Sequence, residues 1–328
     1  MQGAPSIPGL GFRRFRGPSD FPRMVEVARR SKAADGIEEV DSVEEMARNY
    51  SNLKNSDPYQ DLVIVEVNGE AIGYKRVEWW AEHDGTHIYG HFGFLVPEWR
   101  GKGIGRALIR HSEQRLREIA AEHPRERAPM FDSGVYDSQQ GLAELLKCEG
   151  YAPVRYGYDM VRPNLEDIPD APLPEGLEVR PVLPEHYRAI WEAENEAFRD
   201  HWGTSQHEEQ DFVRWQDNQW FQPHIWQVAW DGDQVVGMVR NFILPEENKR
   251  YGRLRGYTEN ISVRRPWRKR GVARSLIASS FRLLKDLGMT EAALSVDAEN
   301  PSGALQLYES MGFRVVKSGT SYRKLMEP

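Results

Sequence analysis

Short apolar runs separated by turn residues recur along the chain, and they predict a sheet of several strands. In the second half, two such runs flank the dipeptide Asp231-Gly232, which is typical of a β-hairpin. Apolar residues recur at helical spacing from Leu276 to Leu287, which predicts a helix with one face packed on a sheet. The predicted strands lie at roughly 177–180, 225–230, 234–244, 253–263, 291–297 and 313–325, and the predicted helices at roughly 184–199, 206–218, 271–287 and 301–311.

The first half shows the same order of elements, so the chain contains an internal repeat. Asn68-Gly69 marks a matching hairpin, and Gly150-Tyr151 closes a helix as Gly312-Phe313 does. A strand–turn–helix segment is repeated at a constant offset of 168 residues. Its shared residues are Trp99, Arg100, Gly103, Arg106, Leu108 and Ile109 in the first copy and Trp267, Arg268, Gly271, Arg274, Leu276 and Ile277 in the second.

Each copy predicts an α+β domain with a mixed, mostly antiparallel sheet flanked by helices. A wholly parallel doubly wound sheet would need a regular alternation of strand and helix, which the pattern lacks. The segment 163–174 is rich in proline and acidic residues, which is typical of a linker. We therefore predict domains at 1–162 and 175–328, each long enough to bury its own core.

Composition narrows the class of protein. Hydrophobic residues make up 40% and charged residues 28%, and no apolar run approaches the roughly 18 residues of a membrane span. The N-terminus lacks the apolar stretch of a secretory signal, and Cys148 is the only cysteine, so we expect a cytoplasmic protein without an internal disulfide or a membrane partner. A net charge of −7 argues against bulk nucleic-acid binding.

The two repeated turns carry the candidate chemistry. Each places glycine and basic residues directly before a helix, where free backbone N–H groups and the helix dipole favour an anion. The second turn holds six cations within residues 264–274. Cations alone at a helix start oppose the helix dipole, so a bound phosphate explains this cluster better than a solvated basic turn does.

Two other binding functions fit the turns less well. The glycines at 101, 103 and 105 are too evenly spaced for a dinucleotide-binding turn, and the acidic residue expected about 20 positions later would fall at Glu122, beside a helix end. A nucleic-acid site would need basic or aromatic residues spread over a wider surface, and the acidic remainder of the domain opposes it. His83, His87 and His91 do not predict a metal site, because Asp84-Gly85 makes a turn between the first two.

Both turns fit the pattern Arg/Gln-x-x-Gly-x-Gly/Ala, and the segment 295–315 continues the second match through Asn300, Tyr308 and Gly312-Phe313. The chain thus resembles a tandem member of the GCN5-related N-acetyltransferases (GNAT family) over essentially its whole length. The resemblance implies acetyl-CoA as acyl donor, with the pyrophosphate on the turn and the pantetheine arm along a strand that splays from its neighbour. In the second half the implied cofactor-binding residues are Ile261, Ser262, Val263, Arg268, Lys269, Arg270, Gly271, Val272, Ala273, Arg274 and Asn300.

The resemblance also suggests the catalytic groups. Tyr308 occupies the position of the general acid that protonates the departing thiolate; the alternative is an ordinary aromatic residue packed on the sheet. Glu259 lies four residues before Val263, which predicts the same strand face and a role as general base; the alternative is a solvated carboxylate, because the family does not fix this residue. Asn300 before Pro301 fits a cofactor contact and a helix N-cap equally well.

The first half departs from this pattern at the catalytic positions. The offsets place Leu146 at the Tyr308 position, Ser138 at the Asn300 position and His91 at the Glu259 position. A leucine cannot protonate a thiolate, so we expect a half that is not catalytic, although its turn still predicts cofactor binding. The residues implied there are Leu95, Val96, Arg100, Gly101, Lys102, Gly103, Ile104, Gly105 and Arg106.

The sequence therefore predicts an N-acetyltransferase that moves acetyl from acetyl-CoA to an amine by direct attack in a ternary complex. The acceptor is the amine of a small molecule or of a peptide N-terminus, and nucleic acid is not expected as a partner. The alternative is a protein that binds or senses acyl-CoA without catalysis. Oligomeric state cannot be predicted from the sequence.

Overall fold

The computed structural model describes residues 1–40, 42–124, 127–199, 201–205, 207–300 and 302–327. The chain forms two compact units. The first unit consists of Met1–Arg155 together with Gly319–Pro328, and the second unit consists of Tyr156–Ser318.

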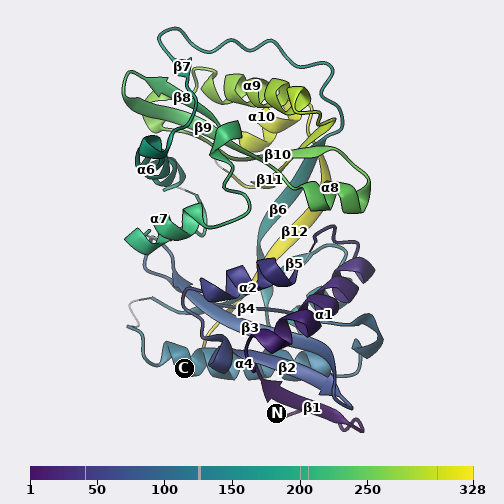
Figure 1. The fold of residues 1–328 in the computed structure, drawn as a ribbon. Helices are drawn as coiled ribbons and strands as arrows, with labels where there is room; N and C mark the ends of the chain where they lie inside the picture. The colour runs from purple at the N-terminus through teal and green to yellow at the C-terminus, as the bar shows by residue number, and fades with distance from the viewer. Residues whose placement is uncertain (41, 125–126, 200, 206, 301, 328) are drawn as a thin grey trace. The chain divides into compact units, whose positions relative to one another are not determined.

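A mixed sheet forms the centre of the first unit, with strand order β1-β2-β3-β4-β5-β12 (Figure 1). All neighbouring strands are antiparallel except β4 and β5, which are parallel. The strands are β1 (Leu10–Arg14), β2 (Leu62–Val67), β3 (Glu70–Ala81), β4 (His87–Leu95), β5 (Met130–Tyr136) and β12 (Arg314–Leu325). The helices are η1 (Pro18–Asp20), α1 (Phe21–Ala34), α2 (Val43–Ser51), α3 (Pro58–Asp61), η2 (Pro97–Trp99), α4 (Ile104–Ala120) and α5 (Gln140–Cys148).

The second unit repeats this plan with strand order β6-β11-β10-β9-β8-β7. Here β10 and β11 form the parallel pair. The strands are β6 (Ala152–Arg162), β7 (Glu178–Val179), β8 (Gln227–Asp231), β9 (Gln234–Ile243), β10 (Arg255–Val263) and β11 (Glu291–Asp297). The helices are η3 (Pro184–His186), α6 (Tyr187–Phe198), α7 (Glu209–Gln216), η4 (Pro223–Ile225), α8 (Pro245–Tyr251), η5 (Arg265–Trp267), α9 (Val272–Asp286) and α10 (Ala304–Ser310).

The predicted fold class is confirmed, and the predicted strands of the second half lie within a few residues of the observed ones. The short helix α8 was not predicted. It begins at Pro245 and ends before Gly252, whose φ of 61° is left-handed. Between two apolar strands, a helix of two turns carries too little periodicity to distinguish it from a hairpin loop.

The last strand of each repeat pairs with a strand of the other repeat. β6 follows the helix that closes the first repeat, yet its residues 157–162 pair with β11 in the second unit. β12 closes the second repeat, yet its residues 319–325 pair with β5 in the first unit. The compact units therefore do not follow the repeat boundaries from which domains 1–162 and 175–328 were predicted.

This exchange predicts that removal of residues 319–328 destabilises the first unit, although they end the second repeat. The deletion removes the strand beside β5 and takes Tyr322 and Met326, both about 6% exposed, out of the first-unit core. We expect a loss of more than about 3 kcal/mol in that unit's free energy of unfolding. Hydrogen exchange measures it: amides of β4 and β5 should lose protection, those of β9 and α9 should keep theirs, and a control chain ending at Met326 should match the full protein. Loss of protection confined to the second unit would contradict the exchange.

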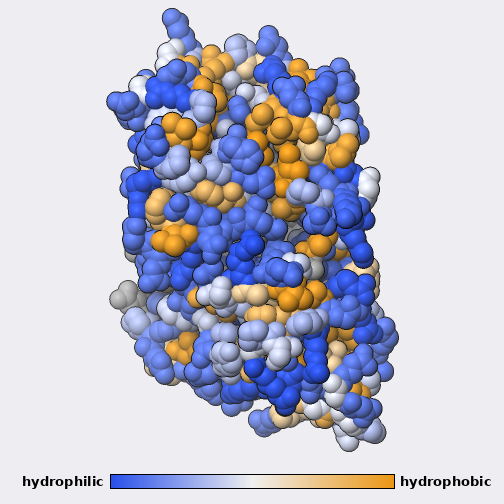
Figure 2. All heavy atoms as spheres, in the orientation of Figure 1, coloured by the Kyte–Doolittle hydropathy of each residue, from blue (hydrophilic) through white to orange (hydrophobic). Residues whose placement is uncertain are grey.

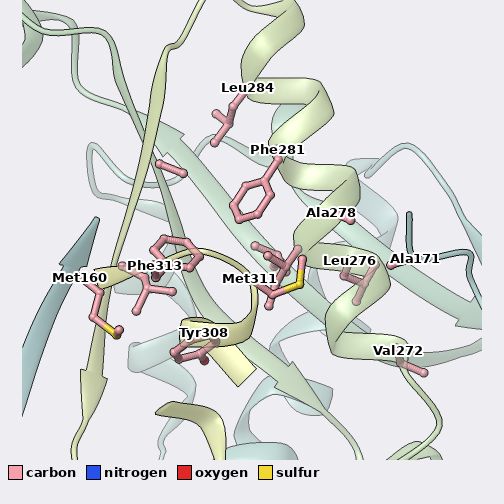
Figure 3. Close-up of a cluster of buried hydrophobic side chains, with 14 of the residues drawn as sticks. Met160, Ala171, Val272, Leu276, Ala278, Phe281, Leu284, Tyr308, Met311 and Phe313 are labelled. Atoms are coloured by element: carbon pink, nitrogen blue, oxygen red, sulfur yellow. The ribbon is translucent and has the colours of Figure 1, made fainter. Parts of the chain in front are cut away.

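In the second unit, helix α9 packs its apolar face on the sheet. Leu276, Phe281 and Leu284 are fully buried. The Phe281 ring points toward Phe313, with ring centroids 5.5 Å apart (Figure 3). This packing fixes the start of α9, and with it the basic turn, against the end of β10.

Within the described part of the chain, no helix is long and apolar enough to cross a membrane. Figure 2 shows hydrophilic residues over most of the visible face of each unit, interrupted by small apolar clusters. The cytoplasmic location remains a prediction from the sequence.

Candidate active site of the second unit

The basic turn between β10 and α9 presents a row of backbone N–H groups. Lys269 and Gly271 have φ values of 60° and 89°, so the chain turns back on itself before Val272 opens the helix. The first N–H that bonds within the helix is that of Ser275, to the Gly271 carbonyl at 3.0 Å. The N–H groups of residues 269–274 have no partner among the described residues. Such a nest of free donors at a helix start is an anion site.

The first unit has the same turn in the same conformation. Gly101 and Gly103 have φ values of 72° and 85°, matching Lys269 and Gly271. In the second unit a lysine thus adopts a left-handed conformation that costs a non-glycine residue about 1 kcal/mol or more. The predicted duplication of the turn therefore extends to the backbone geometry.

Arg268 serves the turn in a way that the sequence did not predict. Its Nε donates to the Val263 carbonyl at 2.9 Å, and its Nη2 donates to the Ala197 carbonyl of α6 at 2.9 Å. These bonds tie α6 to the end of β10, so this guanidinium faces the protein. Arg274, one turn into α9, donates to Ser310 Oγ at 2.6 Å and to Met311 Sδ at 3.4 Å, and both partners are neutral. Among the described residues, no carboxylate compensates its charge.

A cleft of about 560 Å³ opens beside the turn. It brings together the end of β10, the start of α9, and α10 with the loop before it. The predicted residues that line it are Ile261, Ser262, Val263, Arg268, Lys269, Gly271, Val272, Ala273, Arg274, Asn300 and Tyr308. Ala197, Phe198 and His201, at and after the end of α6, also line it. None of these three was among the predicted cofactor-binding residues; the hydrogen bond from Arg268 to the Ala197 carbonyl holds this end of α6 at the cleft.

The parallel strands β10 and β11 separate at this cleft. Their pairing ends at Tyr257 and Ala293, before the segment 261–263. The Glu259 carboxylate lies between the two strands, where its Oε1 accepts a hydrogen bond from the Ser295 N–H at 2.8 Å. The edge of β10 beyond Tyr257 is therefore free of a strand partner on this side.

A β-bulge interrupts β10 at the cleft. Glu259 pairs with Arg240 and Ser262 with Met238, so Asn260 and Ile261 together oppose one residue of β9. Asn260 has a φ of 51°, a left-handed conformation that asparagine adopts more easily than most residues. The extra residue reverses the alternation, so the prediction that Glu259 and Val263 share a strand face is wrong.

Glu259 combines partial burial with one carboxylate neighbour, Asp159. Burial, together with the Asp159 carboxylate of β6, raises its pKa to about 8, while hydrogen bonds from Ser295 and the charge of Arg240 act in the opposite direction. A carboxyl group with a pKa near 8 can accept a proton from an amine close to neutral pH.

Tyr308 belongs both to the core and to the cleft. Its side chain is 7% exposed, and its ring meets Phe313 edge to face (Figure 3). Burial, and then the charge of Glu259, raises its pKa above the ordinary value of 10, so the phenol stays protonated at neutral pH. Its hydroxyl has no hydrogen-bond partner among the described residues. The packed aromatic residue and the general acid, the two interpretations of Tyr308 made from the sequence, are therefore compatible, since the same ring packs in the core and lines the cleft.

Asn300 lines the cleft but does not cap α10. The N-cap of that helix is Gly303, with a φ of 76°. The Asn300 Oδ1 accepts a hydrogen bond from the Ser302 N–H at 2.9 Å, and Pro301 lies outside the described residues. The N-cap alternative is wrong because the helix begins later than predicted.

The strands before the two turns differ in length by one residue. Gly90 in β4 and Tyr257 in β10 are the last residues paired with the parallel neighbour. Leu95 and Val263 pair with a glycine of the preceding strand. Between these landmarks β10 has one residue more, and β4 has no bulge.

This difference changes the predicted counterpart of Glu259. Phe92 of β4 lies opposite Arg76 of β3, as Glu259 of β10 lies opposite Arg240 of β9. The prediction that His91 occupies the Glu259 position is therefore wrong, because the constant offset fails by one residue at the bulge. His91 is buried, and its Nε2 lies 2.8 Å from the Tyr151 hydroxyl.

In the first unit, the positive charges of the turn are paired with acidic side chains. Arg100 donates to Asp35 at 2.5 Å, and Arg106 forms an ion pair with Glu149 at 2.9 Å. A side-chain carbon added at Gly103 would lie 3.7 Å from Pro5, so the N-terminal segment lies in contact range of the turn. Two other predicted residues, Val96 and Ile104, are buried. The Leu95 carbonyl accepts a hydrogen bond from Arg100 Nε, and the Lys102 ammonium lies over the Trp99 ring. Gly105 faces the side chain of Leu145.

The fold and the cleft define a class of enzyme. Residues 23–124 and 187–313 match the Acetyltransferase (GNAT) family, so the chain belongs to this family, with two tandem domains. Membership makes it an acetyl-CoA-dependent acetyltransferase.

Its relatives include several proteins named mycothiol acetyltransferase. That of Geodermatophilus obscurus is 25% identical over 94% of this chain and 95% of its own, and that of Salinispora arenicola is 28% identical over 94% of each. Among solved structures, a GCN5-related N-acetyltransferase from Sphaerobacter thermophilus is 28% identical with a TM-score of 0.74, covering 98% of this chain and 97% of that one. A tandem GNAT protein from the clavulanic acid biosynthesis pathway shares the fold at 15% identity, with a TM-score of 0.68 and coverage of 97% and 99%.

Proposed function

We propose that the second unit transfers acetyl from acetyl-CoA to the amine of a small molecule, by direct attack in a ternary complex. The observation that carries this proposal is that Tyr308 lines the cleft, and that Glu259, held between β10 and β11, lies near enough for its charge to raise the pKa of Tyr308. One group has a pKa raised to about 8 and the other stays protonated at neutral pH. A base that ionises near pH 8 and an acid that stays protonated well above that pH suit proton removal from an amine and proton delivery to a thiolate.

The turn and the cleft fit acetyl-CoA. The N–H groups of residues 269–274 would hold the pyrophosphate, with the uncompensated charge of Arg274 nearby. The free edge of β10 at Ile261–Val263 would receive the amide groups of the pantetheine arm. When bound, the donor supplies an acetyl thioester whose carbonyl carbon an amine can attack.

The chain's own groups would supply the rest of the chemistry. Glu259 takes a proton from the acceptor ammonium, directly or through a water molecule. A backbone N–H near Val263 would face the thioester carbonyl, and a preformed donor of this kind contributes roughly 3 kcal/mol to lowering the barrier. Tyr308 gives its proton to the leaving sulfur, and Asn300 contacts the donor from the loop before α10.

We propose that the first unit supports the second without catalysis. Phe92 and Leu146 stand where Glu259 and Tyr308 stand, β4 has no bulge, and Glu149 compensates Arg106. Its turn residues keep the geometry of an anion site, so acetyl-CoA binding there stays a prediction.

The name of the relatives favours a small-molecule acceptor over a protein N-terminus. The competing function is an acyl-CoA-binding protein without turnover. Release of free CoA from acetyl-CoA, measured by a thiol reagent against a panel of aminosugars, polyamines and peptides, separates the two. We expect amine-dependent release with at least one small amine. Tight acetyl-CoA binding without release for any amine would favour the sensor.

A further inference from the structure

Glu194 in α6 is a buried carboxylate that ties together three elements of the second unit. It is 6% exposed, and its Oε1 accepts from Arg240 of β9 at 2.9 Å and from Asn260 of β10 at 2.5 Å. Its Oε2 accepts from Arg240 at 3.0 Å and from Trp215 Nε1 at 3.3 Å. Arg240 itself is 8% exposed, so the ion pair lies inside the unit.

The tie to Asn260 acts on the bulge of β10. Asn260 is the bulged residue with left-handed φ, and the residues that follow it, Ile261 and Ser262, line the cleft. The hydrogen bond from the Asn260 side-chain amide to Glu194 connects α6 directly to the bulge of β10. The second partner, Arg240, is the residue directly opposite Glu259 across the β9–β10 pairing.

The first unit provides an internal comparison. Arg268 reaches the carbonyl of Ala197 in α6, and Arg100 reaches that of Ser31 in α1, so these two positions correspond. Three residues earlier in each helix stand Glu194 and Ala28.

The glutamate, the asparagine and the bulge are all missing from the first unit. Without the glutamate, Arg76, the counterpart of Arg240, donates to Glu78. The Nε and Nη1 of Arg76 lack partners among the described residues. The three features thus occur together in the unit that carries Glu259 and Tyr308, and are absent together from the other.

We propose that Glu194 is a positioning residue of the second unit: it holds the Asn260 bulge in place and compensates Arg240, so that Glu259 can act as the base. This inference rests on the proposed acetyl transfer. The groups that face Glu259 are Arg240 from β9, Asp159 from β6 and Tyr308 from α10. Of these, only Arg240 favours the ionised carboxylate, and Glu194 is the carboxylate bonded to it.

Two substitutions separate the two parts of this role. Glu194→Gln removes the charge that compensates Arg240, and we expect kcat to fall about 10- to 100-fold. The acid limb of the pH profile should also move to lower pH, because an uncompensated Arg240 favours the ionised form of Glu259. Asn260→Gly keeps the left-handed backbone but cuts the tie; we expect a similar fall in kcat with the limb unmoved. The Kd of acetyl-CoA should change less than about threefold in both.

The bulge has a readout that does not depend on turnover. Hydrogen exchange of the amides in 259–263 should be faster in Asn260→Gly, while α9 keeps its protection. Glu194→Gln should stay close to the unaltered protein, because its amide oxygen still accepts from Asn260. Glu196→Gln is the matched control, since Glu196 lies on the same helix in a more exposed ion pair with Arg264 at 2.8 Å. If Glu194→Gln folds poorly, Asn260→Gly still tests the tie, because it leaves the buried ion pair intact.

Unchanged kcat and unchanged exchange in Asn260→Gly would overturn the positioning role, as would an acid limb that stays in place in a folded Glu194→Gln. Failure of the proposed function gives a different result. No amine would then support CoA release even in the unaltered protein, whereas the exchange of 259–263 would still report whether the tie holds the bulge.

Discussion

Tyr308→Phe lowers kcat by about 10²- to 10⁴-fold and leaves the Kd of acetyl-CoA within about twofold of the unaltered protein. The change deletes one oxygen that has no hydrogen-bond partner among the described residues, and it keeps the ring that packs on Phe313. Only the proton supplied to the departing thiolate is lost, and general acids contribute an effect of this size. Steady-state kinetics give kcat, and titration calorimetry with CoA gives the Kd.

The controls for this variant are its thermal stability and its response to the leaving group of the donor. Phenylalanine fits the same space, so the melting temperature should stay close to that of the unaltered protein. An acetyl thioester donor whose thiol is more acidic than that of CoA should reduce the defect, because a thiolate of lower pKa needs less protonation. Weakened CoA binding with unchanged kcat would contradict the assignment of Tyr308 as the acid.

Glu259→Gln removes the base, and we expect kcat/KM to fall about 10²-fold or more at pH 8. The pKa of Glu259 is raised to about 8, so the carboxylate that accepts the proton is populated above this pH and lost below it. In the unaltered protein, kcat/KM should therefore rise tenfold per pH unit up to about pH 8 and then level off. In the variant this ionisation disappears, and only the titration of the acceptor amine remains in the profile.

Stability offers a second check on Glu259. The folded pKa lies above the usual value of 4.5, so the native state binds more protons than the unfolded state between these two values. The free energy of unfolding should accordingly decrease as pH rises from about 4.5 to 8. Glu259→Gln should remove this decrease, as measured by urea denaturation at pH 5 and pH 9. A carboxylate that is simply solvated would show neither effect.

The parts of the site that were predictable from sequence are local in the chain. A turn with glycine before a helix requires a positive φ and exposes N–H groups, and Gly103 and Gly271 show this. Tyr308 also lies where a local pattern points, since its spacing from Asn300 and Gly312 marked it and its ring lines the cleft; its role as the acid stays a prediction.

The parts that failed depend on pairing between distant strands. The alternation of side chains along a strand does not show which neighbouring strand it pairs with. The exchange of β6 and β12 between the two repeats was therefore not predictable from the sequence. A single inserted residue reverses a strand's faces, and for that reason both the face of Glu259 and its counterpart in the first half were misassigned. The contact of Arg268 with Ala197 was not predictable either, because it is made only in the folded unit; cofactor binding by Arg268 stays a prediction.

The central claim is that the second of two similar turns serves the reaction. Gly271→Asp and Gly103→Asp test it as a matched pair, since both glycines have left-handed φ, both precede a helix, and neither meets another atom closer than 3.7 Å when a side-chain carbon is added. Each change places a carboxylate where an anion would bind, at the same backbone cost.

The measurement is amine-dependent release of CoA by the two variants. We predict that Gly271→Asp loses at least about 10²-fold in kcat/KM for acetyl-CoA, whereas Gly103→Asp stays within about twofold of the unaltered protein. Loss of acetyl transfer in Gly103→Asp, with Gly271→Asp still active, would contradict the account.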